Sequence, residues 1–365
     1  MTTRAGLARL ALAAWLLLPG ALLAQQAPAM AAPAAAPASA ASDDGRGAPR
    51  SCPPEAAPFD PAEMPQALRH ARDRGLLWRI DKDGRTSWLY GTVHAAERGW
   101  MFPGPTVRAA VMASDRVALE LDLLDPAVMQ ALQAAMVAPP GAPPLPPALA
   151  ARLAAQVDAA CLAPAIARLR PELQAVTLVG QSARRSGVDL AYGIDAVIAG
   201  MARATAKPIV ALETPEQQIR LLTSDDPART AAAVGAALDQ LEGGQAQRSI
   251  TRLTRAWADG RLNVLQTYPQ WCECLASEAE QAEYRQMVDA RNPGMARGIA
   301  AAHDAGHRVF AAVGALHMAG PQGLPALMAQ QGFRVQRVVF PAPVPQAAPP
   351  RGAGIDSKPD QAPAQ

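Results

Sequence analysis

Apolar residues form short strand-like runs near both ends of the region 63–340. Two of these runs, 75–80 and 86–90, flank a turn that contains Gly84, and this spacing predicts a β-hairpin. The run 116–123 is apolar almost throughout, which is typical of a central strand buried on both faces. Three further strands are predicted at 207–212, 308–313 and 333–339.

Between these strands the apolar positions follow a helical period, with proline or glycine at the breaks. Helical structure is expected from 126 to about 185, interrupted by a proline-rich loop at 139–147. Shorter helices are expected at 106–114, 193–205, 215–222, 227–241, 245–259, 277–289, 293–302 and 322–331. The pattern predicts an α+β fold: a central β-sheet with a helical middle lobe and strands contributed from both ends of the domain.

Composition limits the classes of partner. Half of the 365 residues are hydrophobic, which suffices for a sizeable core. The chain has 34 basic and 32 acidic residues and a formal charge of +2, so there is no electrostatic case for nucleic-acid binding. Residues 25–61 are rich in alanine and proline, and we expect a disordered linker there. Residues 341–365 are rich in proline, and we expect a disordered tail there. One folded domain is therefore predicted at 62–340.

The first 24 residues have the pattern of a secretory signal peptide. Arg4 and Arg9 form a positive start, 10–18 is an apolar core, and 21–24 offers small residues for cleavage. The apolar run is shorter than the ~20 residues that a membrane span needs, although an uncleaved anchor is the alternative. We expect a periplasmic or secreted protein with no transmembrane segment in the mature chain.

Four cysteines suit such an oxidising compartment. A bond between Cys272 and Cys274, which have one residue between them, would be strained, so we expect each to pair with a distant partner, Cys52 or Cys161. The spacing is not that of a structural zinc site. Cys272-Glu273-Cys274 is interpreted as structural rather than redox-active.

Two strand-like runs end in the same motif, a glycine followed three residues later by a histidine. Gly91 precedes His94, and Gly314 precedes His317. A glycine at a strand exit permits a positive φ or a close backbone approach, so two such turns on neighbouring strands would bring the histidines together. Glu120, on the run 116–123, would complete a set of two histidines and one carboxylate. Such a set suits a catalytic divalent metal, although two unrelated turn histidines would give the same spacing.

Six short pieces of the sequence resemble the TraB/GumN/Tiki family, also written TraB/PrgY/GumN. In chain order they are Leu89-Tyr90-Gly91-Thr92-Val93-His94, Leu119-Glu120-Leu121-Asp122, Gly193-Ile194-Asp195, Leu212-Glu213-Thr214 with Gln217, Arg291-Asn292, and Val313-Gly314-Ala315-Leu316-His317. The resemblance covers about 75–339 and implies an α+β fold. For the Tiki branch it also implies metal-dependent peptide hydrolysis by two G-x-x-H histidines and a glutamate, which correspond here to His94, His317 and Glu120.

The resemblance gives these residues roles. His94, Glu120 and His317 would hold a divalent ion (Mn, Co or Zn), and Glu120 would be a ligand or the general base. Arg291 would be the second catalytic residue, orienting a carboxylate or stabilising an oxyanion, unless it forms a structural ion pair.

Three further carboxylates could support the ligands: Asp122, Asp195 and Glu213. Asp122 would point to the same face of its strand as Glu120, or lie solvated at the strand end. Asp195 and Glu213 are equally explained as capping or structural residues. His303 and His307, four residues apart, are less convincing metal ligands because Gly306 is expected to end their helix between them.

Three functions remain open from the sequence. The first is an exported metal-dependent hydrolase that acts on a peptide or protein substrate. The second is a non-catalytic module that binds a peptide or haem, and the third is a metal-free His/Glu esterase-like hydrolase. The metal, the substrate and the oligomeric state do not follow from the sequence.

Overall fold

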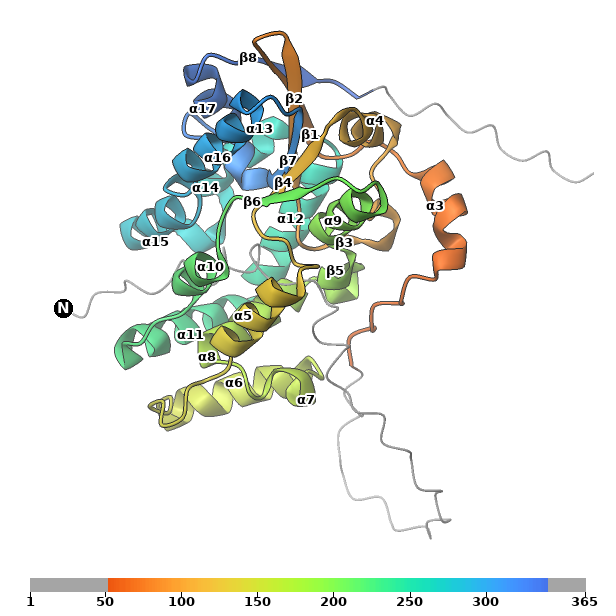
Figure 1. The fold of residues 1–365 in the computed structure, drawn as a ribbon. Helices are drawn as coiled ribbons and strands as arrows, with labels where there is room; N and C mark the ends of the chain where they lie inside the picture. Colours follow the sequence, from red (N-terminus) through yellow and green to blue (C-terminus); the bar gives the residue numbers. More distant parts are fainter. Residues whose placement is uncertain (1–51, 341–365) are drawn as a thin grey trace, which may run out of the picture.

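A six-stranded sheet crosses the middle of the protein in the computed structural model, which describes residues 52–340. Figure 1 shows the sheet surrounded by helices. The strand order is β6-β4-β7-β2-β1-β8. The bounds are β1 Leu76–Lys82, β2 Arg85–Thr92, β4 Arg116–Leu119, β6 Ile209–Ala211, β7 Val309–Gly314 and β8 Arg334–Val338. The predicted central sheet, built from strands at both ends of the domain, is confirmed.

The direction of the strands decides where a site can form. The predicted hairpin pairs β1 with β2 in antiparallel register, and β8 adds to β1 in the same way. The four strands β6, β4, β7 and β2 are parallel to one another. Parallel strands end at one edge of the sheet, and ligands of open α/β sheets bind at that edge.

Strand β4 is shorter than the pattern predicted. It ends at Leu119 rather than continuing to 123, because the chain turns at Asp122. The Asp122 carboxylate accepts a hydrogen bond from the Leu124 N–H, and its carbonyl accepts one from the Asp125 N–H. Glu120 is therefore the first residue after the strand, at the carboxyl edge.

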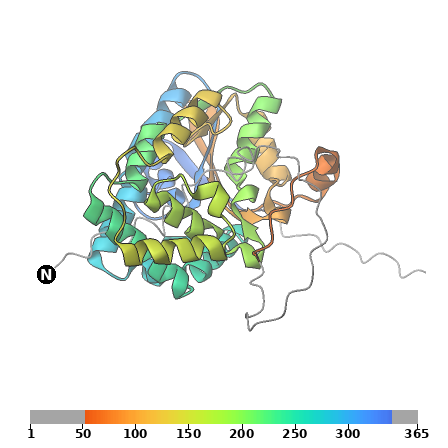
Figure 2. The same cartoon turned by 90° about the horizontal axis from the view of Figure 1, so that it is seen from below.

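The helical lobe lies between β4 and β7 in sequence. Its helix α8 (Pro171–Gln181) is buried along almost its whole length, and α6, α11 and α12 pack around it. Seen from below, the lobe lies in front of the sheet (Figure 2). The other lobe elements are α5 Pro126–Met136, α6 Pro147–Ala159, α7 Ala163–Ile166, α9 Ile194–Ala204, α10 Pro215–Leu222, α11 Pro227–Glu242 and α12 Gln245–Ala258. The remaining short pieces are β3 Ala96–Glu97, β5 Val188–Asp189, η3 Arg184–Ser186 and η4 Leu190–Tyr192.

Several elements of the second half lead back to the sheet. The helix predicted at 277–289 divides into α15 (Glu278–Tyr284) and a π-helical turn, η6 (Arg285–Asp289). Helix α16 (Asn292–Asp304) then runs to β7. Not predicted from the pattern were α13 Leu262–Gln266, α14 Tyr268–Trp271 and η5 Glu273–Leu275. Four further helical elements precede β4 in the chain, namely η1 Pro61–Glu63, α3 Met64–His70, η2 Arg98–Trp100 and α4 Pro105–Ala113. Two more, η7 Ala315–Met318 and α17 Leu324–Gln330, follow β7.

The structure contains two disulfides, and neither is the pairing expected from the sequence. Cys272 bonds to Cys274, so the prediction of distant partners for these two is wrong. Glu273, between the two cysteines, begins the 3-10 turn η5, and the two Cα atoms that flank it are 5.0 Å apart, within the range that a disulfide needs. Cys52 bonds to Cys161 and so ties the start of the described chain to the helical lobe.

Three predictions lie wholly or partly outside residues 52–340. The signal peptide and the proline-rich tail fall outside the described residues, and so does most of the linker. Within residues 52–340, the helices are all too short or too polar to cross a bilayer.

Candidate functional site

The carboxyl edge of the parallel sheet carries four ionisable side chains, one after each strand. Glu213 follows β6, Glu120 follows β4, His317 follows β7 and His94 follows β2. Two carboxylates and two imidazoles thus lie in order across one edge. The strand order brings these four side chains together although they come from distant segments of the sequence, from near the start of the domain (His94) to near its end (His317).

Gly314, the last residue of β7, lies at the centre of this group. A methyl group built on Gly314 would be 3.3 Å from Glu120 Oε1, 3.6 Å from His317 Cδ2 and 4.0 Å from His94 Nε2. The φ of Gly314 is −48°, so the glycine is needed for close approach and not for a left-handed backbone. The three predicted ligands therefore surround one glycine.

His94 is held by a carboxylate. Its Nδ1 donates to Asp195 Oδ2 at 2.7 Å, and the Thr92 hydroxyl donates to Asp195 Oδ1 at 2.6 Å. Burial by itself lowers the pKa of His94, but the Asp195 and Glu120 carboxylates together outweigh burial, and the pKa is raised above its usual value. Helix α9 places Asp195 there because Gly193 has no side chain; a Cβ at that position would meet the His94 carbonyl at 2.7 Å.

Arg291 lies between the other charged groups. Its Nη2 donates to Glu120 Oε2 at 2.6 Å, and its Nε donates to Glu213 Oε1 at 2.7 Å. Its Nη1 lies 3.1 Å from His317 Nε2 and donates to the Met287 carbonyl at 3.0 Å. The side chain is 6% exposed, and the two carboxylates raise its pKa despite burial. The guanidinium is therefore a permanent buried cation that contacts both carboxylates and one histidine.

His317 is held in the neutral form. A guanidinium can only donate, so His317 Nε2 accepts from Arg291, and Nδ1 carries the proton that it donates to Asn292 Oδ1 at 2.6 Å. Burial and the nearby Arg291 charge lower the pKa of His317 to about 3. The lone pair of Nε2 thus faces the site at neutral pH.

Glu120 is held in the ionised form. Burial alone would raise its pKa, but Arg291 and the two histidines lower it to about 2. Oε1 also accepts from the Gly314 N–H at 2.8 Å, and Oε2 accepts from Gln218 Nε2 at 3.3 Å. A carboxyl group with so low a pKa is a poor general base near neutral pH. Its chemistry suits a charged ligand better.

The carboxylates expected to support the ligands separate into two groups. Asp195 and Glu213 contact His94 and Arg291, respectively. Asp122 does not join them; it forms two 2.8 Å hydrogen bonds with Arg203 of α9. The expectation that Asp122 shares a strand face with Glu120 fails, because the strand ends before either residue.

Sequence reasoning missed two side chains that orient the site. Gln218, on α10, donates to both Glu120 and Glu213. Asn292 was noted only as part of a matching piece, yet it fixes the tautomer of His317. Its position next to Arg291 was the available signal. Gln218 gave none, because a buried glutamine on a helix has no distinctive pattern.

His303 has a structural role instead of a metal-binding one. It is fully buried, and its Nδ1 lies 2.8 Å from Ser87 Oγ. Its Nε2 lies 3.0 Å from the Lys82 carbonyl. The helix ends at Asp304, before His307, as expected.

The donor set fits a divalent ion in its chemistry but not in its present contacts. Two imidazole Nε2 atoms, each with its Nδ1 held by a side-chain oxygen, and one ionised carboxylate are suitable ligands. Within residues 52–340, however, there is no group of three His, Cys, Asp or Glu residues arranged to hold a metal. Arg291 contacts both Glu120 and His317, two of the three proposed ligands.

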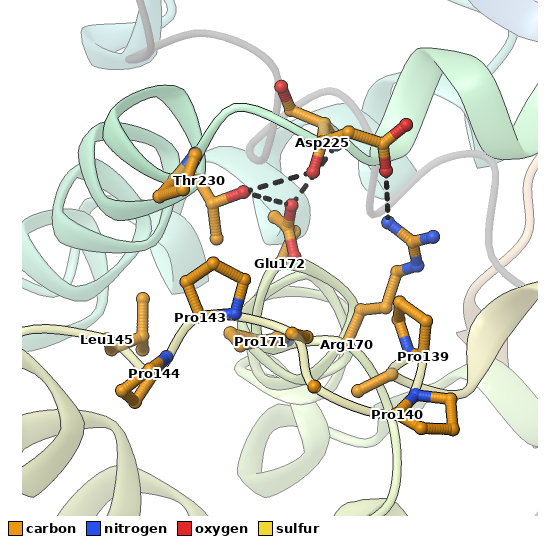
Figure 3. Close-up of a pocket in the computed structure, with 15 residues that line it drawn as sticks. Pro139, Pro140, Pro143, Pro144, Leu145, Arg170, Pro171, Glu172, Asp225 and Thr230 are labelled. Atoms are coloured by element: carbon orange, nitrogen blue, oxygen red, sulfur yellow. Dashed lines mark hydrogen bonds and ion pairs between the residues drawn. The ribbon is translucent and has the colours of Figure 1, made fainter.

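A pocket of about 280 Å³ lies elsewhere, in the helical lobe. Figure 3 shows the proline-rich loop along one side, with Glu172 and Thr230 bonded at 2.6 Å, and Arg170 paired with Asp225 at 3.2 Å. The residues that line it include none of the predicted site residues. The pocket is therefore separate from the carboxyl edge.

Comparisons with known proteins agree with the motifs. A family model described as TraB/PrgY/gumN family matches residues 76–337. Neither the curated proteins nor the solved structures gave a match. The matched region runs from the first strand to the last and contains every residue of the carboxyl-edge site. The chain belongs to the TraB/PrgY/gumN family.

Proposed function

We propose that the protein is a metal-dependent hydrolase that acts on peptide or protein substrates. His94, Glu120 and His317 would hold the divalent ion (Mn, Co or Zn). When bound, the ion would acidify a water molecule and polarise the scissile carbonyl. The observation that supports the proposal is the convergence of these three side chains around Gly314.

The surrounding residues prepare the three donors. Asn292 fixes the tautomer of His317 that carries its lone pair on Nε2. Asp195 orients His94 through Nδ1, so that Nε2 faces Gly314. Gly314 N–H and Gln218 donate to the Glu120 carboxylate and orient it. Metal-binding histidines are commonly held in this way by an oxygen acceptor on the second ring nitrogen.

Metal uptake tests the proposal. The purified protein is dialysed against Mn, Co or Zn ions, and the unbound metal is then removed. Elemental analysis should find one divalent ion per chain. His94→Ala, Glu120→Ala and His317→Ala should lose both the ion and peptide cleavage while the circular dichroism spectrum is retained. His70→Ala is the matched control, because His70 is exposed on α3, and it should keep both. Unchanged cleavage in all three site variants would reject this site.

A second candidate is favoured by the Arg291 contacts. In a metal-free hydrolase, Arg291 would supply the positive charge, and His94 with Asp195 would act as the base. Asp195 raises the pKa of His94 against the effect of burial, which moves it toward the range of an effective general base. Full cleavage activity in the presence of a strong chelator would favour this second candidate over the first.

We also propose that the protein works outside the cytoplasm, in the periplasm or after secretion. The two disulfides support this, since such bonds persist in oxidising compartments. Determining the amino-terminal residue of the exported protein would test the predicted cleavage near residue 24.

A further inference from the structure

Arg291 and a metal ion would compete for the same atom. An imidazole nitrogen has one lone pair, in the plane of the ring, and it can serve one partner at a time. In this structure the lone pair of His317 Nε2 accepts a hydrogen bond from Arg291 Nη1 at 3.1 Å. The Nδ1 atom offers no alternative, because its proton is donated to Asn292. A metal ion can therefore bind His317 only after the Arg291 contact is broken.

The guanidinium cannot avoid this competition by losing its charge. Arginine stays protonated in proteins, and the side chain is only 6% exposed. Its Nη2 also contacts Glu120 Oε2, a second proposed ligand atom, at 2.6 Å. Arg291 thus holds the negative charge of Glu120 and the lone pair of His317 at once. A divalent ion would hold the same two groups.

Two contacts keep Arg291 in this position, and neither involves a proposed ligand. Glu213 pairs with Nε and Nη2, and the Met287 carbonyl accepts from Nη1. Met287 belongs to the π-helical turn 285–289, which ends two residues before Arg291. Such turns are rare and frequently occur at functional sites, where the helical hydrogen-bond pattern changes. Glu213 can pair with Arg291 whether or not His317 is bound to it.

We propose that Arg291 is the resident cation of this site and that a divalent metal ion enters by displacing it from His317 and Glu120. The inference rests on the proposed function. It adds that the metal-free protein is stabilised by an internal competitor. Metal affinity is accordingly set by Arg291 as well as by the three ligands.

Calorimetric titration of the chelator-treated full chain with MnCl₂, CoCl₂ and ZnCl₂ tests this. Arg291→Met removes the competing donor, but it leaves two buried carboxylates without a positive partner, and loss of folding would obscure its effect on metal binding. The double variant Arg291→Met with Glu213→Gln removes one positive and one negative charge together, so the net charge of the site is unchanged. We expect the double variant to bind the preferred ion at least about tenfold more tightly than the wild type. Adding His317→Ala should abolish that gain.

Arg203→Met is the matched control. Arg203 also pairs with a carboxylate near the end of β4, but its partner is Asp122, and it contacts neither His317 nor Glu120. The metal affinity of the Arg203→Met variant should stay within about twofold of that of the wild type. If the wild type binds metal through His94, Glu120 and His317 and the double variant binds no more tightly, displacement is wrong and the proposed function stands. If neither protein binds any of the three ions, both proposals fall.

Discussion

The two ends of strands β4 and β7 carry the same kind of ion pair in different surroundings. At the amino ends, Arg308 and Asp115 pair at 2.6 Å with side chains 52% and 39% exposed. At the carboxyl ends, Arg291 and Glu120 also pair at 2.6 Å, but each is 6% exposed. Water and salt screen the first pair, whereas the second depends on each partner for compensation of a buried charge. The comparison indicates that the carboxyl end keeps its charges for a purpose other than stability.

The largest difference between the two ends is expected from removing the arginines. Arg291→Met should lower the free energy of unfolding by about 3–5 kcal/mol, because Glu120 and Glu213 would remain buried without a positive partner. Arg308→Met should change the urea midpoint only slightly. Urea denaturation at neutral pH measures the stability of both variants, and equal m-values would show that the two curves can be compared directly. Similar losses in the two variants would contradict the proposed difference between the ends.

A medium effect is expected at the His94 side of the carboxyl end. Asp195→Asn should lower the pKa of His94 and destabilise the protein by about 2 kcal/mol at about pH 6, since a charge-assisted hydrogen bond is lost. The folded-state pKa of His94 is raised, so this stabilisation is complete below the unfolded value of ~6.5 and is lost as pH rises through the folded value.

The measurement is the urea midpoint of wild type and Asp195→Asn from about pH 5.5 to 9. The gap between the two proteins should narrow as the pH rises. A gap that widens with pH would mean that His94 is not stabilised in its charged form. Thr92→Val is the control, because it removes a bond to the same carboxylate without touching His94.

A smaller effect is expected from the glycines of the two G-x-x-H turns. Gly91→Ala would bring a methyl group 3.2 Å from the Ala315 Cα, part of the backbone, and should cost about 2 kcal/mol. Gly314→Ala would meet the Glu120 carboxylate at 3.3 Å, a side chain that can move, and should cost only about 1 kcal/mol.

The two glycine variants should rank in the opposite order when the disturbance of the site is measured instead of the stability. Gly314→Ala should shift the imidazole NMR signals of His94 and His317 more than Gly91→Ala does, because its methyl group points among them. If Gly91→Ala disturbs both histidines more, Gly314 is not the centre of the carboxyl-end group.

Sequence reasoning located the carboxyl end but not its internal contacts. Strand ends and G-x-x-H turns are local features, so the sequence could place His94 and His317 just after strand ends. The contacts of Arg291 and Gln218 depend on how α10 and the π-helical turn pack against the sheet, and no local pattern records that packing. For Asp122 the sequence left two possibilities, an extra site acid or a strand-end residue, and the structure pairs it with Arg203 beyond the end of β4.

The cysteines were misjudged for a related reason. The expected strain in a bond between Cys272 and Cys274 assumed an ordinary backbone between helices. Glu273 lies in a 3-10 turn that leaves the flanking Cα atoms only 5.0 Å apart, and the apolar pattern did not predict that turn. Local geometry therefore decided the pairing where sequence spacing suggested the opposite.

The smallest effect is expected from Asp115→Asn, at the amino end. The Arg308 side chain and N–H donate to Asp115 and lower its pKa to about 2. Any stabilisation from this pair is present above the unfolded value of ~3.9 and is lost as pH falls through about 2. Because both side chains are well exposed, the urea midpoints of wild type and Asp115→Asn should differ near neutral pH by little more than the experimental error. They should become identical in strong acid. A loss as large as that of Arg291→Met would show that exposure does not separate the two ends, and the functional interpretation of the buried charges would lose its main physical support.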